Sequence, residues 1–111
     1  MPTAYKVLGQ INPSATTETQ LYLVPASTSA VVSTLMICNQ ASTAATYRIA
    51  VVKSGGTVPA AALSWVVYNA TVGSSDSTAL TLGLTLATGD QIRVWASTAN
   101  ISFAAFGSEL T

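Results

Sequence analysis

The sequence contains no histidine, the residue that most often serves as a general base or a metal ligand near neutral pH. A nucleophile activated by histidine is therefore impossible. One cysteine and four scattered carboxylates also do not make the usual ligand set of a zinc site. We therefore expect a protein that is not an enzyme and that binds neither a cofactor nor a metal.

Charged residues are scarce as well, since four Lys or Arg and four Asp or Glu make up 7% of the 111 residues and cancel to a net charge of zero. Proteins that bind nucleic acid neutralise phosphates with many cations, so this inventory excludes a nucleic-acid partner. Soluble domains usually have about a quarter of their residues charged, and charge on edge strands prevents pairing between molecules. Its scarcity favours assembly, and we expect a homo-oligomer.

Long apolar runs are absent too. A membrane span needs about 18 apolar residues, whereas the richest stretch, residues 30–38, is short and contains Ser33 and Thr34. The N-terminal residues do not show a basic stretch followed by an apolar one, so we expect no secretory signal. Cys38 has no disulfide partner within the chain, and we expect it to be a small apolar residue in a strand core. These observations predict synthesis in a cytoplasm and no membrane partner.

The residues that are abundant favour β-structure. Half of the chain is apolar, and β-branched and aromatic residues occur in runs of five to ten, separated by Gly, Asn, Ser and Asp. The runs predict eight strands, at residues 4–8, 20–24, 30–39, 46–53, 63–70, 78–86, 91–96 and 100–106. Eight short strands without a helical period predict an all-β fold, a single-domain antiparallel β-sandwich that is jelly-roll-like, over residues 1–111. Pro13 and Pro25 mark strand ends, so the segment 1–19 is a candidate extended arm.

Two glycine-containing segments predict tight turns. Residues 54–56, Ser-Gly-Gly, are suited to a hairpin turn, and Gly89 is expected to be left-handed in a second hairpin between residues 82–86 and 91–95. The run at residues 30–38 is more continuous than alternating, which is typical of a strand covered on both faces. Its second cover is either another strand pair or a neighbouring subunit, and the sequence leaves both open.

The aromatic residues have two interpretations. Trp65, Tyr68 and Trp95 form a candidate sugar-stacking platform on which Asn69 and Asp90 fix hydroxyl groups. The alternative is ordinary packing, because both tryptophans lie in strand-like contexts where large residues fill a core or a subunit interface.

Two further features concern contacts between chains. Arg48 is either one half of an ion pair across an interface or an exposed strand residue. Phe103 and Phe106 are three residues apart, so in a strand they face opposite sides, one toward the core and one toward a neighbour, unless a bulge at residues 104–105 turns both inward.

Several segments along the whole chain are similar to a known group. They are YKVLGQ at 5–10, Pro13, ATTET at 15–19, LY at 21–22, VPA at 24–26, CN at 38–39, YRIAV at 47–51, SF at 102–103 and FGSE at 106–109. With these segments the chain resembles small all-β virion structural proteins of tailed bacteriophages, a group that includes capsid decorations and tail- or fibre-associated modules. Residues 57–63 and 73–77 depart from the likeness.

The resemblance implies a virion structural protein that is made in the host cytoplasm. The first choice is a capsid decoration or cement protein, with a trimer favoured, that stabilises the shell through symmetric contacts with the major capsid protein or other virion proteins. The alternative is a tail, baseplate or fibre module that binds host glycans. The candidate interface residues are Tyr5, Tyr22, Arg48, Trp65, Trp95, Phe103 and Phe106.

Overall fold

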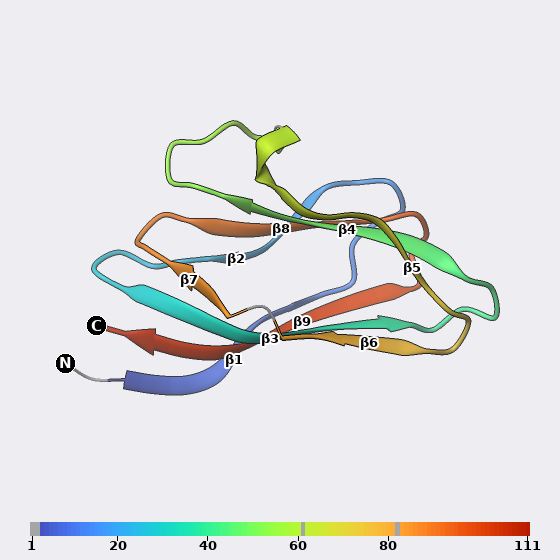
Figure 1. The fold of residues 1–111 in the computed structure, drawn as a ribbon, viewed down its shortest axis with the longest axis horizontal. Helices are drawn as coiled ribbons and strands as arrows, with labels where there is room; N and C mark the ends of the chain where they lie inside the picture. The colour runs from blue at the N-terminus through green and yellow to red at the C-terminus, as the bar shows by residue number, and fades with distance from the viewer. Residues whose placement is uncertain (1–2, 61, 82) are drawn as a thin grey trace.

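The alternating strand residues build two antiparallel sheets that face each other. The computed structural model describes residues 3–60, 62–81 and 83–111, and within these it has nine strands (Figure 1). Sheet A consists of β1 (Thr3–Ile11), β3 (Ser29–Asn39), β6 (Ser77–Leu80), β7 (Leu84–Leu86) and β9 (Ile101–Leu110). Sheet B consists of β2 (Thr19–Leu23), β4 (Ala45–Val52), β5 (Trp65–Val72) and β8 (Gln91–Ala96). The predicted all-β sandwich is confirmed.

The strand order defines the topology. Sheet A has the order β1-β9-β3-β6, with β7 also paired to β3, and sheet B has the order β2-β8-β4-β5. Strands β6 and β7 pair with two successive parts of β3 and so occupy one strand position. Each sheet then has four positions, and the chain changes sheet at every connection between positions except the one from β4 to β5. This arrangement is a jelly roll, as expected.

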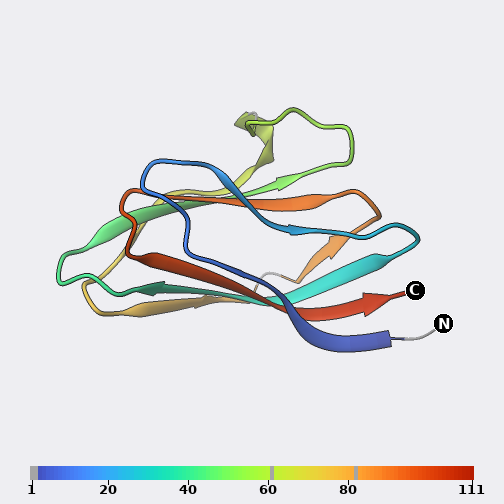
Figure 2. The ribbon, with the colours of Figure 1, turned by 180° about the vertical axis from the view of Figure 1, so that it is seen from behind.

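Most predicted strands lie where the pattern placed them, although β9 extends to Leu110 beyond the predicted end at residue 106, and three other segments differ. The run at 78–86 is divided into β6 and β7, and Leu82 lies outside the described residues. Residues Ala62–Ser64 form a 3-10 turn, so β5 begins at Trp65. In the segment 1–19, where we considered an extended arm, Thr3–Ile11 is an edge strand paired with β9 along its length (Figure 2).

The two predicted turns had different outcomes. Gly55 has a φ of +79° in a tight turn that the Gly56 N–H closes on the Lys53 carbonyl oxygen at 2.7 Å. Strands β4 and β5 do pair with each other, but β4 ends at Val52 and β5 begins at Trp65, so this turn is only the first part of a longer connection and not a tight hairpin. Gly89 also has the expected positive φ, +85°, but the hairpin is wrong, because β7 lies in sheet A and β8 in sheet B. The turn at Gly89 is a corner between the sheets. A positive φ is compatible with either connection, and only the strand pairing distinguishes them.

The core lies between the sheets and is formed by every second residue of the strands. Its largest fully buried side chains come from both sheets and include Phe103, Leu35, Ile37, Ile49 and Ile92. In β3 the buried residues alternate with half-buried ones, so the apolar run at 30–38 has one face in the core and the other on the outside of sheet A.

Candidate functional site

The outer face of sheet A has no unpaired charge among its described strand residues. The five strands of this sheet contain only two Lys, Arg, Asp or Glu residues, Lys6 and Glu109. Their side chains pair with each other, with Lys6 Nζ 2.6 Å from Glu109 Oε1. Glu109 is buried and lies on the inner side of β9, so this pair contributes no carboxylate to the outer face.

The buried carboxylate of Glu109 also connects the two sheets. Tyr22, from β2 of sheet B, donates its hydroxyl hydrogen bond to Glu109 Oε2. Hydrogen bonds from Lys6 and Tyr22 hold the pKa of Glu109 below its ordinary value of 4.5, although burial opposes this effect. Burial and the neighbouring Glu109 raise the pKa of Tyr22 above its ordinary value of 10.0. Tyr22 is therefore part of the interior of this chain instead of a surface for a neighbour.

Two bulges divide the outer face of sheet A. Leu8 is the extra residue in β1 and Ser33 the extra residue in β3, and both lie beside Phe106 in the central strand β9. Bulges bend the strands that contain them. Along the strands, a hollow of about 380 Å³ lies on one side of these two bulges, and a hollow of about 540 Å³ lies on the other side.

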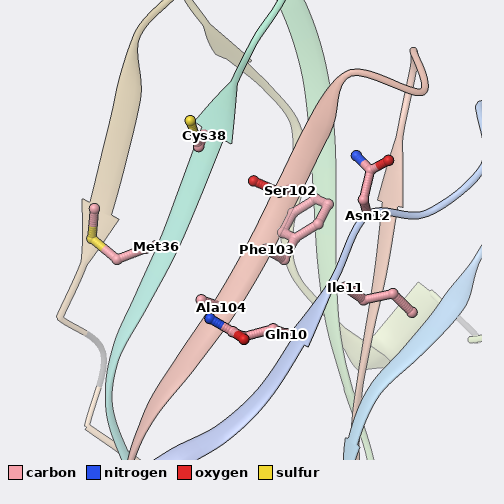
Figure 3. A pocket seen from close by; sticks show the side chains of 8 residues that line it. All are labelled: Gln10, Ile11, Asn12, Met36, Cys38, Ser102, Phe103 and Ala104. Carbon is pink, nitrogen blue, oxygen red and sulfur yellow. The ribbon is translucent and has the colours of Figure 1, made fainter.

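The first hollow is lined by apolar side chains together with the polar side chains of Gln10, Asn12 and Ser102 (Figure 3). Met36 and Cys38 come from β3, and Ser102 and Ala104 from β9, all of them half-buried between neighbours that are fully buried. Cys38 therefore lies on the outside of the sheet, and the expectation that it is a core residue is wrong. Around Cys38, successive residues of β3 face alternately the core and the outside of the sheet, and Cys38 is one of those that face outward.

The second hollow contains two of the candidate interface residues, Tyr5 and Phe106. Tyr5 is 85% exposed. Phe106 is half-buried and faces outward, whereas Phe103 is 2% exposed and packs edge-on against Tyr47 at a centroid distance of 6.3 Å. The two phenylalanines thus face opposite sides, as expected for a strand without a bulge at residues 104–105, and Phe103 belongs to the core.

The outer face of sheet B is different because an arginine and three aromatic residues meet there. We call Arg48, Trp65, Tyr68, Asn69 and Trp95 the Arg48 cluster. Arg48 on β4 lies opposite Trp95 on β8, and its guanidinium carbon is 3.9 Å from the centroid of that ring. The same carbon is 4.3 Å from the ring of Tyr68 and 6.0 Å from that of Trp65. Neither tryptophan is in the core; both are half-buried on this face.

Irregular pairing of β5 with β4 brings the residues of the Arg48 cluster together on one face. Between the pairs Tyr47–Ala70 and Ile49–Val67, β4 has one residue and β5 has two, and a further residue, Val66, is extra before Trp65. In a regular strand Trp65 and Tyr68 would face opposite sides. The extra residue places both on the outer face, where their rings meet edge to face at 5.6 Å and 71°. The left-handed Asn69, with φ +56°, completes the bulge, and its Oδ1 accepts a 2.7 Å hydrogen bond from Arg48 Nε.

A second arginine on this face is neutralised. Arg93 Nε pairs with Glu18 Oε2, and the carboxylate of Glu18 also accepts hydrogen bonds from the backbone N–H of Ala60 at 3.1 Å. Ala60 belongs to the connection between β4 and β5, so this contact holds the connection over the outside of sheet B (Figure 1). Beside it, Ala62, Trp65 and Tyr68 line a hollow of about 480 Å³.

The sugar platform expected from Trp65, Tyr68 and Trp95 forms only in part. The Arg48 guanidinium covers one face of Trp95, and Asp90 is occupied by the backbone N–H groups of Ser54 and Ala87 at 2.9 Å each. The open aromatic surface is the corner of Trp65 and Tyr68. Sequence reasoning did not connect Arg48 with the aromatic residues; the one local signal was Asn69, a residue type that tolerates positive φ, in the middle of a strand.

The comparisons with known proteins concern the fold. No protein-family model matches the chain, and no curated protein matches it. A solved structure described as "Structure of infectious bursal disease virus Gx strain" matches with a TM-score of 0.54 and 10% sequence identity. The match covers 97% of this chain and 31% of that chain, so the present chain spans about a third of the length of that protein. A likeness at this identity shows a shared β-sandwich fold, here with a chain from a virus.

In the part of the chain that the structure describes, no helix is long and apolar enough to cross a membrane.

Proposed function

We propose that the protein is a virion structural protein that decorates and cements a capsid, with the outer face of sheet A seated on neighbouring chains. One observation carries this proposal: the strands of sheet A contain two charged residues, and both are used in one ion pair, so no Lys, Arg, Asp or Glu of these described strands is left unpaired on the outer face. Two exposed large apolar side chains, Tyr5 and Val7, also lie on β1 of this sheet, and exposed apolar surface marks interaction sites in soluble proteins. The similarity of the fold to a chain from a virus supports the same role.

The mechanism is passive. The two hollows of sheet A accept side chains of a partner, and Tyr5 adds an exposed aromatic side chain beside the second hollow. Each contact excludes water from apolar surface and so contributes a small free energy of association. A symmetric oligomer, for which we propose a trimer, repeats these contacts against the major capsid protein or other virion proteins, and simultaneous engagement raises the total affinity.

The test compares virus particles that contain the protein with particles from which its gene has been deleted. Genome release on heating is followed with a DNA-binding dye. We expect the deleted particles to assemble and to release their DNA at a lower temperature. Equal release temperatures would contradict the cement role.

The copy number per particle gives an independent measurement. Quantitative mass spectrometry of purified particles is expected to show as many copies as the shell has sites, in a fixed ratio to the major capsid protein. A number far below that ratio, with the protein enriched in isolated tails, would contradict a place in the shell and indicate a tail, baseplate or fibre module of tailed bacteriophages.

A further inference from the structure

Arg48 is a cation whose charge is not neutralised within the described residues. All four side-chain carboxylates are engaged elsewhere: Glu109 with Lys6, Glu18 with Arg93, and the two aspartates with backbone N–H groups. Lys53 also lacks a carboxylate, but it is exposed in a connection, whereas Arg48 is half-buried in the centre of a sheet face. Arg48 is thus the one cation that the described part of the fold both orders and leaves unpaired.

The guanidinium is fixed in position by its neighbours. Trp95 and Tyr68 lie within 4.3 Å of its central carbon, and Asn69 Oδ1 accepts the hydrogen of Nε at 2.7 Å. Among the described residues nothing accepts a hydrogen bond from the two Nη groups, and no buried side-chain nitrogen or oxygen lacks a partner, so the Nη groups reach solvent. A guanidinium with both Nη groups free is suited to bind a carboxylate through two parallel hydrogen bonds.

A hollow is lined by two of the aromatic rings that surround the guanidinium, Trp65 and Tyr68. Ala62, Trp65 and Tyr68 line about 480 Å³, a volume within the usual range of small-molecule sites. The Trp65 and Tyr68 rings meet at 71° and form a corner, and Tyr68 is shared between the corner and the Arg48 stack. Aromatic faces of this kind pack against the C–H face of a pyranose ring.

We propose that the Arg48 cluster binds an acidic sugar. The sugar carboxylate pairs with the Nη groups of Arg48, and the face of the pyranose ring packs in the corner of Trp65 and Tyr68. A neutral sugar fills the corner but leaves the arginine without an acceptor. An acidic peptide side chain satisfies the arginine but offers no ring face to the corner, so the combination of the two features favours the sugar. The site is independent of the proposed contact through sheet A, which is on the opposite side of the sandwich.

The experiment titrates the full chain with two matched pairs of sugars. Methyl glucuronide and methyl glucoside differ only in the C6 carboxylate, and sialyllactose and lactose differ by an acidic sugar. Binding is followed by the indole N–H signals of Trp65 and Trp95 in nitrogen-15 correlation spectra. We expect at least one acidic sugar to shift these signals and to bind more tightly than its neutral counterpart by about tenfold or more.

Variants assign the effect to the cluster. Arg48→Met keeps an apolar stem between the rings and is expected to abolish the preference for the acidic sugar, and Arg48→Lys to lose most of it, because Lys lacks the planar fork. Tyr68→Ala is expected to weaken the binding of both the acidic and the neutral sugar of a pair. Lys53→Met removes the other unpaired cation and is the matched control, with binding unchanged.

Several outcomes would overturn the proposal. The first is that no sugar shifts the indole N–H signals. The second is that the acidic and the neutral sugar of each pair bind with equal affinity. The third is that Arg48→Met and Lys53→Met lose the same amount of affinity for the acidic sugar. Tighter binding of an acidic peptide, tested as N-acetyl-Gly-Glu-Gly amide, than of either acidic sugar would identify a protein partner instead. None of these results depends on whether the protein cements a capsid.

Discussion

The two sheets contain two charged residues each, yet their outer faces differ. Sheet A pairs Lys6 with the buried Glu109, whereas sheet B carries Arg48 and Arg93 outward. Sheet A is bare on the outside, while the connection from β4 to β5 lies over sheet B. The same number of charges therefore gives an uncharged face and a cationic one. The two sheets also differ in the signs of these charges: Lys6 and Glu109 of sheet A are opposite and pair with each other, whereas both charged residues of sheet B are arginines. The difference therefore depends both on which charges each sheet holds and on the direction of each side chain.

Bulges set these directions in both sheets. In sheet A the extra residues Leu8 and Ser33 lie at one level and divide the face into two hollows. In sheet B the irregular β5 places Trp65 and Tyr68 on one side. Because a bulge changes the parity of all later residues in the strand, one extra residue decides which face a side chain joins. The following predictions test this explanation, from the largest expected change in stability to the smallest.

Gly107→Ala is expected to have the largest effect because it lies beside the bulges of sheet A. A Cβ at Gly107 would overlap the carbonyl oxygen of Val31 on the neighbouring strand β3, which is backbone and cannot move alone. We expect the free energy of unfolding to fall by about 3 kcal/mol or more. Urea denaturation measures this change. Ser108→Ala, at the next residue along β9, is the control and is expected to change the free energy of unfolding little. Equal losses in both variants would show that β9 and β3 do not approach each other closely at Gly107.

Asn69→Val tests the bulge that builds the face of sheet B. A β-branched residue at φ +56° is strained, and we expect a loss of about 1–3 kcal/mol. Asn69→Gly removes the hydrogen bond to Arg48 but accepts the positive φ, and it should lose less than about 1 kcal/mol. Thermal unfolding of both variants gives the comparison. If valine and glycine were equally tolerated, the left-handed conformation would not be required at this position.

The aromatic corner shows why the sequence predicted the strands better than the faces. Runs of apolar and β-branched residues located β2, β3, β4 and β8 within one residue of their ends, because local side-chain patterns reflect burial between two sheets. The spacing of Trp65 and Tyr68 gave no such guidance. A bulge depends on how the strand pairs with another strand that is distant in the sequence. The one local signal for it in β5 is Asn69, a residue type that tolerates the positive φ found there. For the same reason Cys38 was expected in the core although its parity is outward.

Glu109→Gln tests whether the inward ion pair of sheet A stabilises the sandwich. The pKa of Glu109 is below 4.5 in the folded protein, so its stabilising contribution is present above pH 4.5 and is lost as the pH falls through the lowered pKa. We expect the variant to lose about 1–2 kcal/mol at pH 7. The difference in melting temperature between wild type and variant, measured from pH 7 to pH 2, should shrink in the acid range.

Measurements at alkaline pH provide the control for the hydrogen bond between Tyr22 and Glu109. Tyr22 has a raised pKa, so its contribution is present below pH 10.0 and is lost as the pH rises through the raised value. Tyr22→Phe should therefore differ less from wild type at high pH than at pH 7. A difference between wild type and Glu109→Gln that stays constant with pH would show that the carboxylate does not titrate in contact with Lys6 and Tyr22.

Ala104→Asp should have the smallest effect on stability and the clearest effect on assembly. Ala104 is half-buried on the outside of sheet A, where it lines the first hollow, so a carboxylate there keeps contact with water and should lower the free energy of unfolding by about 1 kcal/mol or less. Thr71→Asp, which introduces the same carboxylate at an exposed position on β5 of sheet B, is the control. Because a charge buried against an apolar partner surface is costly, only Ala104→Asp should reduce the number of copies on virus particles, as measured by mass spectrometry. Equal occupancy of both variants would show that the uncharged face of sheet A is not the surface that contacts the shell, and a loss only in Thr71→Asp would transfer that role to sheet B.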